Sequence, residues 1–420
     1  MVASQSIPSP WHLVDFQARR ALLSATASFL LASLVSYQLA LMPLRIAILA
    51  EFPLSALEGE AVGRGGGQGC TWLPQLALAF QQYKDLEIHW VILDRAIRQR
   101  VIVEALGQFF HRVPAMKFSV DLAFNYLPAR FALGREIKLI KPDVVHAWGT
   151  ELIYPAALQD FKGPTTLSMQ GVLTEYQRIG GLPSDWRWKK MISSEPTFIR
   201  SASIVTSESQ WGIDRVREID PHADCRMVEY GVHPSFYDLE WKPDPTRPYA
   251  LYVGGSGTRK GLDVLIEAMK LLPNREWELR LAGDSSILAA CDAVGLKNVS
   301  SLGLLSWADM KLQLQGAWCS VLPTRGDTSP NSVKEARVIG VPVVTSIHGG
   351  QSGYIRDGEN GRIVEPLNAE NLAKALTDVM DSYDHAGILG KTHHSKDRNY
   401  LHPSRTAEGF AAIYHELVAR

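Results

Sequence analysis

The sequence predicts an α/β protein built from two doubly wound, mostly parallel-sheet domains. The chain has 420 residues, more than a single core usually holds, so two domains are expected. From residue 45 onward, short apolar runs alternate with helix-length segments, as in βαβ units. The Pro-rich stretch Lys242–Pro248 separates two such series and is the best linker candidate.

The first series indicates a parallel sheet between residues 45 and 207. Each strand candidate is a short apolar run bounded by turn residues, which is typical of a buried parallel strand. The expected strands are 45–50, 86–93, 143–148, 164–169 and 203–207, with an amphipathic helix over 71–83.

The second series begins after the linker. Apolar residues from Leu262 to Leu272 recur at helical spacing and form one face. Ligands of such folds gather at the carboxyl ends of the strands, so we expect a site there, in the cleft between the domains. The expected strands are 249–253, 278–282, 319–322 and 342–345, and the expected helices are 262–272, 332–339 and 369–381.

The N-terminal extension, residues 1–42, stands apart from both series. Residues 21–44 contain no charged side chain and follow Arg19 and Arg20, and the run Ala21–Met42 is long enough to span a bilayer. Three interpretations stay open: a membrane anchor or uncleaved signal, a secretory signal, or a loosely ordered extension that the fold does not need. In the third, Met42 is the true start.

Charge and cysteine content exclude some classes of protein. Lys and Arg number 43 against 44 Asp and Glu, and this balance argues against nucleic acid as a partner. The four cysteines form no CxxC pair, which favours reduced cytosolic thiols over a disulfide framework or a zinc site. The segment Arg95–Lys141 is rich in basic and aromatic residues. It is either a surface that docks on an anionic membrane or a solvated helical face.

The stretch Asp327–Gly340 is the most informative part of the chain. Two carboxylates, Asp327 and Glu335, lie eight positions apart, and a small polar loop between them leads into a helix. A helix start offers unpaired N–H groups to an anion, and a carboxylate inside the helix accepts hydrogen bonds from hydroxyl groups. This pattern indicates a sugar-nucleotide site.

Small loops at other strand ends support the same site. Gly254–Gly261 follows a strand and carries Arg259 and Lys260, so it is either a diphosphate cradle or an ordinary strand–helix turn. It matches neither a Walker A loop nor GxGxxG. Gly283 and Asp284 either line this cleft or form a turn with a helix-capping Asp.

These elements together resemble the retaining family-4 glycosyltransferases with the GT-B fold, over about residues 43–420. The resemblance is specific because the order and spacing of the elements agree, although each element alone is weak. It divides the chain into residues 1–42, a first, acceptor-binding domain (43–241), a nucleotide-sugar-binding domain (242–400) and a C-terminal helix returning to the first domain (401–420). The matching elements are Gly65–Gly69, Lys260–Gly261, Leu281–Asp284, Asp327–Gly340, Val341–Gly350 and Asp357–Gly361.

The resemblance implies roles for individual residues. Lys260 would hold the donor diphosphate, Glu335 the ribose hydroxyls, and Asp327 the transferred sugar, so these three are the candidate catalytic residues. The implied donor-binding set is Gly66, Gly67, Ser256, Arg259, Lys260, Gly283, Asp284, Asp327, Ser329, Pro330, Asn331, Ser332, Val333 and Glu335.

Three residues of the first domain are candidates for acceptor binding. His146 and Glu151 flank the loop after the strand 143–148, and His146 is alternatively a packed strand histidine. Gln170 stands where many family members carry a histidine. Two further departures from the family pattern are Gly255, at the usual position of an arginine, and Asp327, where the family usually has Glu.

The implied activity is sugar transfer from a nucleotide-diphosphate donor to a glycan, lipid-linked or small-molecule acceptor, with retention of anomeric configuration. The family needs no divalent metal, and this chain has no Asp-x-Asp pair. No cofactor is expected, since the nucleotide sugar is a co-substrate. The alternatives are a catalytically silent GT-B partner or scaffold in polysaccharide assembly and a sugar-nucleotide epimerase. The expected location is cytoplasmic, with association with the inner membrane face left open.

Overall fold

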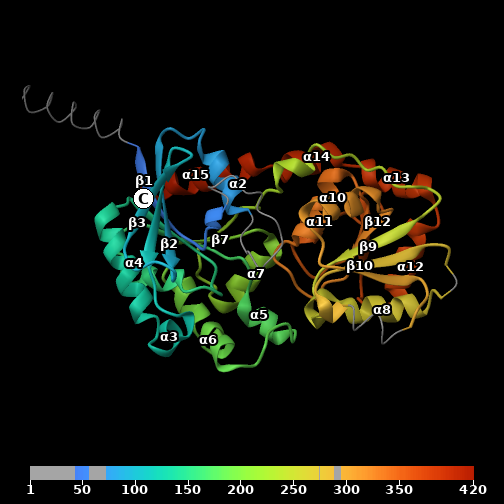
Figure 1. Ribbon diagram of the computed structural model, residues 1–420, viewed down its shortest axis with the longest axis horizontal. Helices are drawn as coiled ribbons and strands as arrows, with labels where there is room; N and C mark the ends of the chain where they lie inside the picture. The colour runs from blue at the N-terminus through green and yellow to red at the C-terminus, as the bar shows by residue number, and fades with distance from the viewer. Residues whose placement is uncertain (1–42, 56–71, 274, 288–294) are drawn as a thin grey trace, which may run out of the picture.

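Two separate sheets organise the chain (Figure 1) in the computed structural model, which describes residues 43–55, 72–273, 275–287 and 295–420. The first sheet has eight strands, all parallel except for the antiparallel edge strand β3. In spatial order they are β3 (Val101–Ala105), β4 (Gln108–Pro114), β2 (Leu86–Asp94), β1 (Leu44–Leu49), β5 (Val144–Trp148), β6 (Thr165–Ser168), β7 (Ile204–Ser207) and β8 (Cys225–Met227).

The second sheet has six strands, and every neighbouring pair is parallel. The predicted strands 249–253, 278–282 and 319–322 are confirmed residue for residue, and so is the class of two parallel α/β domains. In spatial order the strands are β11 (Val299–Gly303), β10 (Glu278–Ala282), β9 (Tyr249–Val253), β12 (Cys319–Leu322), β13 (Val343–Ser346) and β14 (Gly361–Val364).

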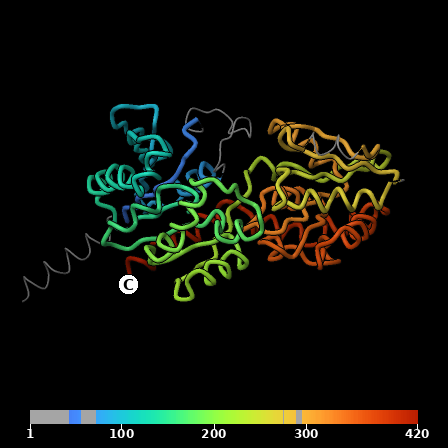
Figure 2. The backbone as a smooth tube through the Cα atoms, turned by 90° about the horizontal axis from the view of Figure 1, so that it is seen from below, coloured from blue at the N-terminus to red at the C-terminus, as the bar shows by residue number. Residues whose placement is uncertain are grey.

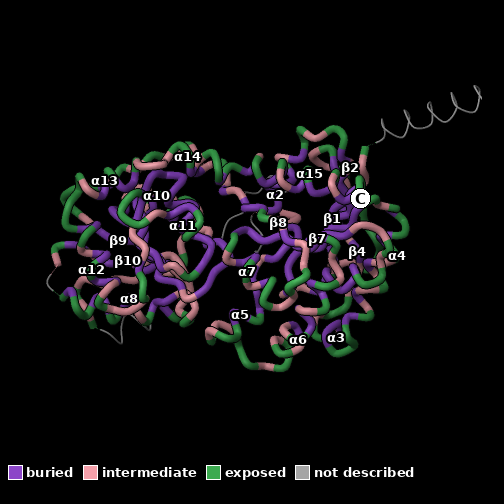
Figure 3. Tube along the Cα trace, turned by 180° about the vertical axis from the view of Figure 1, so that it is seen from behind, coloured by how far each residue is buried: buried purple, intermediate pink, exposed green. Residues whose placement is uncertain are grey.

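Helices cover both sheets, and the strands form the buried centre of each domain (Figure 3). The first domain contains α2 (Leu73–Phe80), α3 (Phe118–Ala123), α4 (Leu127–Ile140), the 3-10 helix η2 (Tyr154–Asp160), α5 (Leu173–Arg178), α6 (Trp186–Arg200) and α7 (Gln210–Ile219). The second domain contains η3 (Pro234–Phe236), whose Phe236 is buried in its core, and also η4 (Thr258–Lys260), α8 (Leu262–Lys270), α10 (Trp307–Gly316), α11 (Asn331–Ile339), η5 (Gly350–Gly353), α12 (Ala369–Met380), α13 (Tyr383–Lys391) and α14 (His394–Tyr400).

The β3–β4 hairpin corrects the interpretation of the basic segment Arg95–Lys141 as a helical face. Its first part forms two antiparallel strands, and only α3 and α4 are helical. The connecting residues Leu106 and Gly107 both have positive φ angles, 57° and 68°, which suits the tight turns of hairpins. This turn carries no Asn-Gly or Asp-Gly pair, so it was not predicted.

The last helix, α15 (Pro403–Ala419), lies on the first domain although it follows the second (Figure 2). It packs against α2, and Phe410 and Tyr414 are completely buried in the core of the first domain. The two crossings between the domains touch, because a Cβ added at Gly231 would lie 2.5 Å from the backbone of Pro403. The N-terminal extension, 1–42, and the loop Gly65–Gly69 lie outside the described residues.

Candidate functional site

The carboxyl ends of β9, β10 and β12 bring the predicted donor loops together. Gly261, before α8, has φ of 73°, and a Cβ there would lie 1.8 Å from the carbonyl oxygen of Pro323. Only glycine fits such a position. The loop after β12 is fixed to this turn, because the backbone N–H of Arg325 donates to the carbonyl of Arg259 at 2.7 Å. Arg259 and Lys260 are therefore held beside Asp327.

Asp327 is the centre of a compact ionic cluster. Its Oδ2 accepts hydrogen bonds from Arg259 Nη1 at 3.0 Å and from Lys260 Nζ. The guanidinium of Arg259 also lies 4.4 Å from the ring centre of Tyr176, a residue of the first domain. Burial alone would raise the pKa of Asp327, but the two cations and their hydrogen bonds lower it below its usual value. The carboxyl group is thus ionised.

Glu335 has different neighbours from Asp327. It is buried in α11, one turn inside the helix, and lines a small pocket that Trp72, His233, Trp307 and Asn331 also line. This helix starts after Pro330, whose side chain cannot cap the first N–H groups. A carboxylate beside an uncapped helix start and an aromatic wall suits recognition of a ribose hydroxyl and a base.

The loop before α11 contacts the first domain directly. Thr328 Oγ1 donates to the carbonyl of Gln170 at 2.8 Å, and Ser209 Oγ donates to the carbonyl of Thr328 at 2.6 Å. Ser329 Oγ donates to Glu229 Oε2 at 3.0 Å. The residues predicted to present N–H groups to the donor, 329–333, therefore lie where the two domains meet.

Lys334 is a residue that the sequence analysis missed. Its ammonium group is completely buried and donates at 3.0 Å to each of Glu208 Oε2, Glu229 Oε1 and the carbonyl of Tyr230. Burial alone would lower the pKa of Lys334, but the two carboxylates raise it above its usual value. The pKa of Glu208 is also raised, by burial and by repulsion from Glu229. This triad joins α11 to the ends of β7 and β8 across the domain boundary.

The predicted donor residues at β10 lie on a turn. Asp284 is exposed, and its Oδ1 accepts a hydrogen bond from the backbone N–H of Ser286 at 2.9 Å. This geometry agrees with the interpretation of Asp284 as a residue that caps a turn. Ser256 Oγ lies 2.5 Å from Ser286 Oγ, so the loops after β9 and β10 touch. A Cβ at Gly283 would lie 2.2 Å from the carbonyl oxygen of Gly254. Of the predicted donor residues, Gly66 and Gly67 lie outside the described part of the chain.

The position of His146 does not fit its predicted role in acceptor binding. The side chain is completely buried, with Nδ1 at 2.7 Å from Tyr414 Oη and Nε2 at 2.7 Å from Ser168 Oγ. Burial lowers its pKa to about 3, so the ring is neutral. Both nitrogens are engaged in the core, and the alternative of a packed strand histidine fits the geometry.

Glu151 and Gln170, in contrast, lie together at the ends of β5 and β6. A Cβ added at Gly149 would lie 2.7 Å from Glu151 Oε1 and 2.8 Å from Gln170 Nε2. Burial, followed by repulsion from Glu195 and Glu51, raises the pKa of Glu151 to about 7. A carboxyl group that titrates near neutrality beside an amide is suited to contact a hydroxyl group of an acceptor.

The raised pKa of Glu151 predicts a pH-dependent stability. Its contribution is full below the unfolded pKa of about 4.5 and is lost as pH rises through the folded pKa. We expect Glu151→Gln to be more stable than wild type by about 2 kcal/mol at about pH 8 and equal to it at about pH 4.5, with a discount for partial exposure. Urea unfolding at both pH values measures this. Glu104→Gln, on the exposed strand β3, should show no such difference, and a pH-independent effect of Glu151→Gln would contradict the assignment.

Two parallel-sheet domains, with the strand ends of the second facing the first, define a GT-B protein, and comparison with known proteins supports this class. Residues 237–396 match the model of the family described as glycosyl transferases group 1. Residues 237–396 are therefore similar to that family, and the two domains together have the GT-B fold.

Individual relatives are distant. Glycogen synthase from Mycobacterium tuberculosis is 26% identical over 261 residues, which are 57% of this chain and 61% of that protein. The chain spans between 48% and 61% of the length of three curated relatives that it matches.

Solved structures agree over more of the chain. Sucrose-phosphate synthase from Thermosynechococcus elongatus has a TM-score of 0.72 at 18% identity, covering 90% of this chain and 99% of that one. HepE from Anabaena, in complex with UDP and glucose, has a TM-score of 0.66 at 14% identity, with 89% of this chain and 100% of that one covered. These likenesses concern the fold.

Proposed function

We propose that this chain transfers a sugar from a nucleoside-diphosphate sugar to a glycan, lipid-linked or small-molecule acceptor. The observation that carries the proposal is the cluster of Arg259, Lys260 and Asp327 at the strand ends of the second domain, next to the start of α11. A sugar nucleotide needs cations for its diphosphate and carboxylates for its hydroxyl groups, and this cluster offers both. The structural relative HepE was solved in complex with UDP-glucose, which is a nucleoside-diphosphate sugar.

The proposed mechanism follows from the charges. Breaking the bond between the sugar and the phosphate leaves negative charge on the departing diphosphate. Lys260, Arg259 and the N–H groups at the start of α11 would neutralise it as preorganised charges and dipoles. The acceptor hydroxyl would attack the same face of the sugar, and the departing phosphate oxygen would take its proton. The anomeric configuration is then retained.

Metal independence is part of the proposal. Among the residues that the structure describes, no group of three His, Cys, Asp or Glu side chains is arranged to bind a metal ion. Activity after treatment with a chelator tests this point. A peripheral contact with the inner face of a membrane, which a lipid-linked acceptor requires, is likewise proposed.

A catalytically silent GT-B partner is the second candidate, and one observation favours it. In the structure Asp327 already pairs with both Arg259 and Lys260, so the diphosphate must share these cations with a carboxylate. A sugar-nucleotide epimerase would use the same donor site without an acceptor.

A donor screen separates these functions. The full chain is incubated with a panel of nucleoside-diphosphate sugars, and thermal stabilisation and donor breakdown are both followed. Stabilisation with slow hydrolysis supports a transferase, and formation of an epimer without acceptor supports the epimerase. If no sugar nucleotide stabilises the fold, the transferase proposal is wrong.

Gly255 offers a gain-of-function test of the same site. A Cβ at this position meets no atom within 4 Å, and its backbone has no positive φ. We expect Gly255→Arg to bind UDP roughly tenfold more tightly, because a charged hydrogen bond to phosphate is added. Isothermal titration measures the affinity. Gly134→Arg, an equally open position on α4, serves as the control; equal affinities of the two variants would show that Gly255 does not face the diphosphate.

A further inference from the structure

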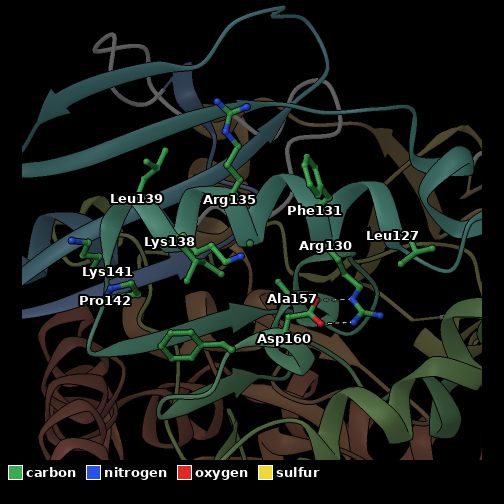
Figure 4. Close-up of a pocket in the computed structure, with 13 residues that line it drawn as sticks. Leu127, Arg130, Phe131, Arg135, Lys138, Leu139, Lys141, Pro142, Ala157 and Asp160 are labelled. Atoms are coloured by element: carbon green, nitrogen blue, oxygen red, sulfur yellow. Dashed lines mark hydrogen bonds and ion pairs between the residues drawn. The ribbon is translucent and has the colours of Figure 1, made fainter.

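Helix α4 exposes a row of apolar side chains on the surface of the first domain. Leu127, Phe131 and Leu139 are 59%, 77% and 56% exposed, and the exposed Arg135 lies between the last two. A spacing of four residues keeps such side chains on one helix face. Figure 4 shows Phe131, Arg135 and Leu139 pointing to the same side of the helix. Side chains of this size are normally buried, so the row is an unusual surface.

A groove of about 990 Å³ runs along this helix. Its lining includes Phe131 and Lys138 of α4 and Ala157 of the neighbouring segment (Figure 4), together with Phe161. The helix carries Gly134 at this surface, where a Cβ would meet nothing within 4 Å. The groove is therefore open to a ligand with apolar parts.

The basic residues of Arg95–Lys141 fall into two groups. Arg100 pairs with Glu136, Arg112 with Asp94, and Arg130 with Asp160, so these three stabilise the fold. A second group, Arg135, Lys138 and Lys141, is exposed and has no ion-pair partner among the described residues.

Two acids lie near the second group. The carboxylate of Asp160, in the groove, is neutralised by Arg130, and exposed Asp143 accepts the backbone N–H of Arg45 at 2.8 Å. The exposed Lys162 adds a further positive charge beside Asp160. The surface around α4 is therefore positively charged as well as apolar.

We propose that this surface docks the protein on an anionic lipid bilayer. We call it the α4 face, and it consists of Leu127, Phe131, Arg135, Lys138, Leu139 and Lys141. Cations attract the anionic headgroups, while exposed Phe and Leu side chains enter the boundary with the acyl chains. A protein partner fits less well, because lysine is depleted at protein interfaces.

The position of α4 is compatible with activity on a membrane. In Figure 1 the helix lies at the outer end of the first domain, far from the second domain. Docking through the α4 face leaves the loops between the two sheets uncovered. No helix among the described residues has the length and apolar composition needed to cross a bilayer, so contact through the described part of the chain would be peripheral.

Vesicle flotation of the full chain tests the proposal. We expect the protein to float with vesicles containing phosphatidylglycerol, not with pure phosphatidylcholine, and to be released by high salt. The variant Arg135→Gln/Lys138→Gln/Lys141→Gln should have a roughly 100-fold lower lipid partition coefficient, because each cation near an anionic surface contributes several-fold. Phe131→Ser should also weaken binding.

Matched controls lie on the second domain. The triple variant Lys374→Gln/Lys391→Gln/Lys396→Gln removes the same charge from exposed positions, and Ile388→Ser removes an apolar side chain that is 63% exposed. Both should bind vesicles as wild type does. Circular dichroism and thermal melting check that all variants are folded.

Two results would overturn the proposal. One is the absence of wild-type binding to anionic vesicles, which would leave a protein partner for the α4 face. The other is equal binding of wild type and the triple α4 variant, which would assign the contact to another segment, such as residues 1–42. Binding of UDP is measured on the same samples without lipid, so a failure of membrane docking is distinguishable from a failure of sugar-nucleotide binding.

Discussion

Replacing Lys260 by alanine should weaken binding of a nucleoside diphosphate roughly 30- to 100-fold, because a charged hydrogen bond to phosphate is lost. The fold should survive, since Asp327 keeps its 3.0 Å contact with Arg259 and is not left as an unpaired buried charge. Isothermal titration with UDP measures the change, and urea unfolding shows that stability is retained.

The control for this variant is Lys270→Ala on the exposed face of α8, where the lysine pairs with Glu267 at 2.6 Å. Its affinity for UDP should equal that of wild type. Glu335→Ala should also reduce affinity, because the ribose loses a hydrogen-bond acceptor. Unchanged affinity in both Lys260→Ala and Glu335→Ala would place the donor elsewhere.

Replacing Lys334 by methionine should lower the free energy of unfolding by about 3–5 kcal/mol, the typical effect of breaking a buried ion pair. Methionine has a similar volume, so the loss comes from charge. The carboxylates of Glu208 and Glu229 would remain buried without the ammonium group that each contacts at 3.0 Å. Urea unfolding near neutral pH measures the difference.

Two further measurements distinguish this electrostatic cause from a packing defect. Adding Glu208→Gln to Lys334→Met should restore part of the stability, because one of the two buried charges is removed. Without Lys334 the raised pKa of Glu208 rises further, so the variant should regain stability as pH falls and this carboxyl group becomes protonated. Lys391→Met, at an exposed position on α13, is the control. A loss that is independent of pH and of Glu208→Gln would contradict the electrostatic explanation.

The second domain was predictable because its signals are local. Strands β9, β10 and β12 are short apolar runs that end at Gly-rich or polar loops. The apolar face of α8 is evident from the helical spacing of its apolar residues. Gly261 precedes that helix with a positive φ angle of 73°.

The first domain was less predictable, for identifiable reasons. The β3–β4 hairpin turns at Leu106 and Gly107, and leucine is not a turn signal. His146 could have faced either the core or a ligand from its sequence position alone. Its orientation depends on Tyr414, a residue of the last helix, which is 268 positions away in the chain.

The sequence by itself determined the order of βα units, and its pattern predicted that Asp327, Glu335 and Lys260 belong to a sugar-nucleotide site. Such features depend on residues close together in the chain, whose spacing fixes secondary structure and strand ends. Only the tertiary structure decided that Asp327 pairs with both Arg259 and Lys260, which lie 68 and 67 positions away. It also decided that Lys334 joins the two domains through Glu208 and Glu229. The residues next to a charged side chain in a helix do not indicate its ion-pair partner, because that partner is determined by packing between distant parts of the chain.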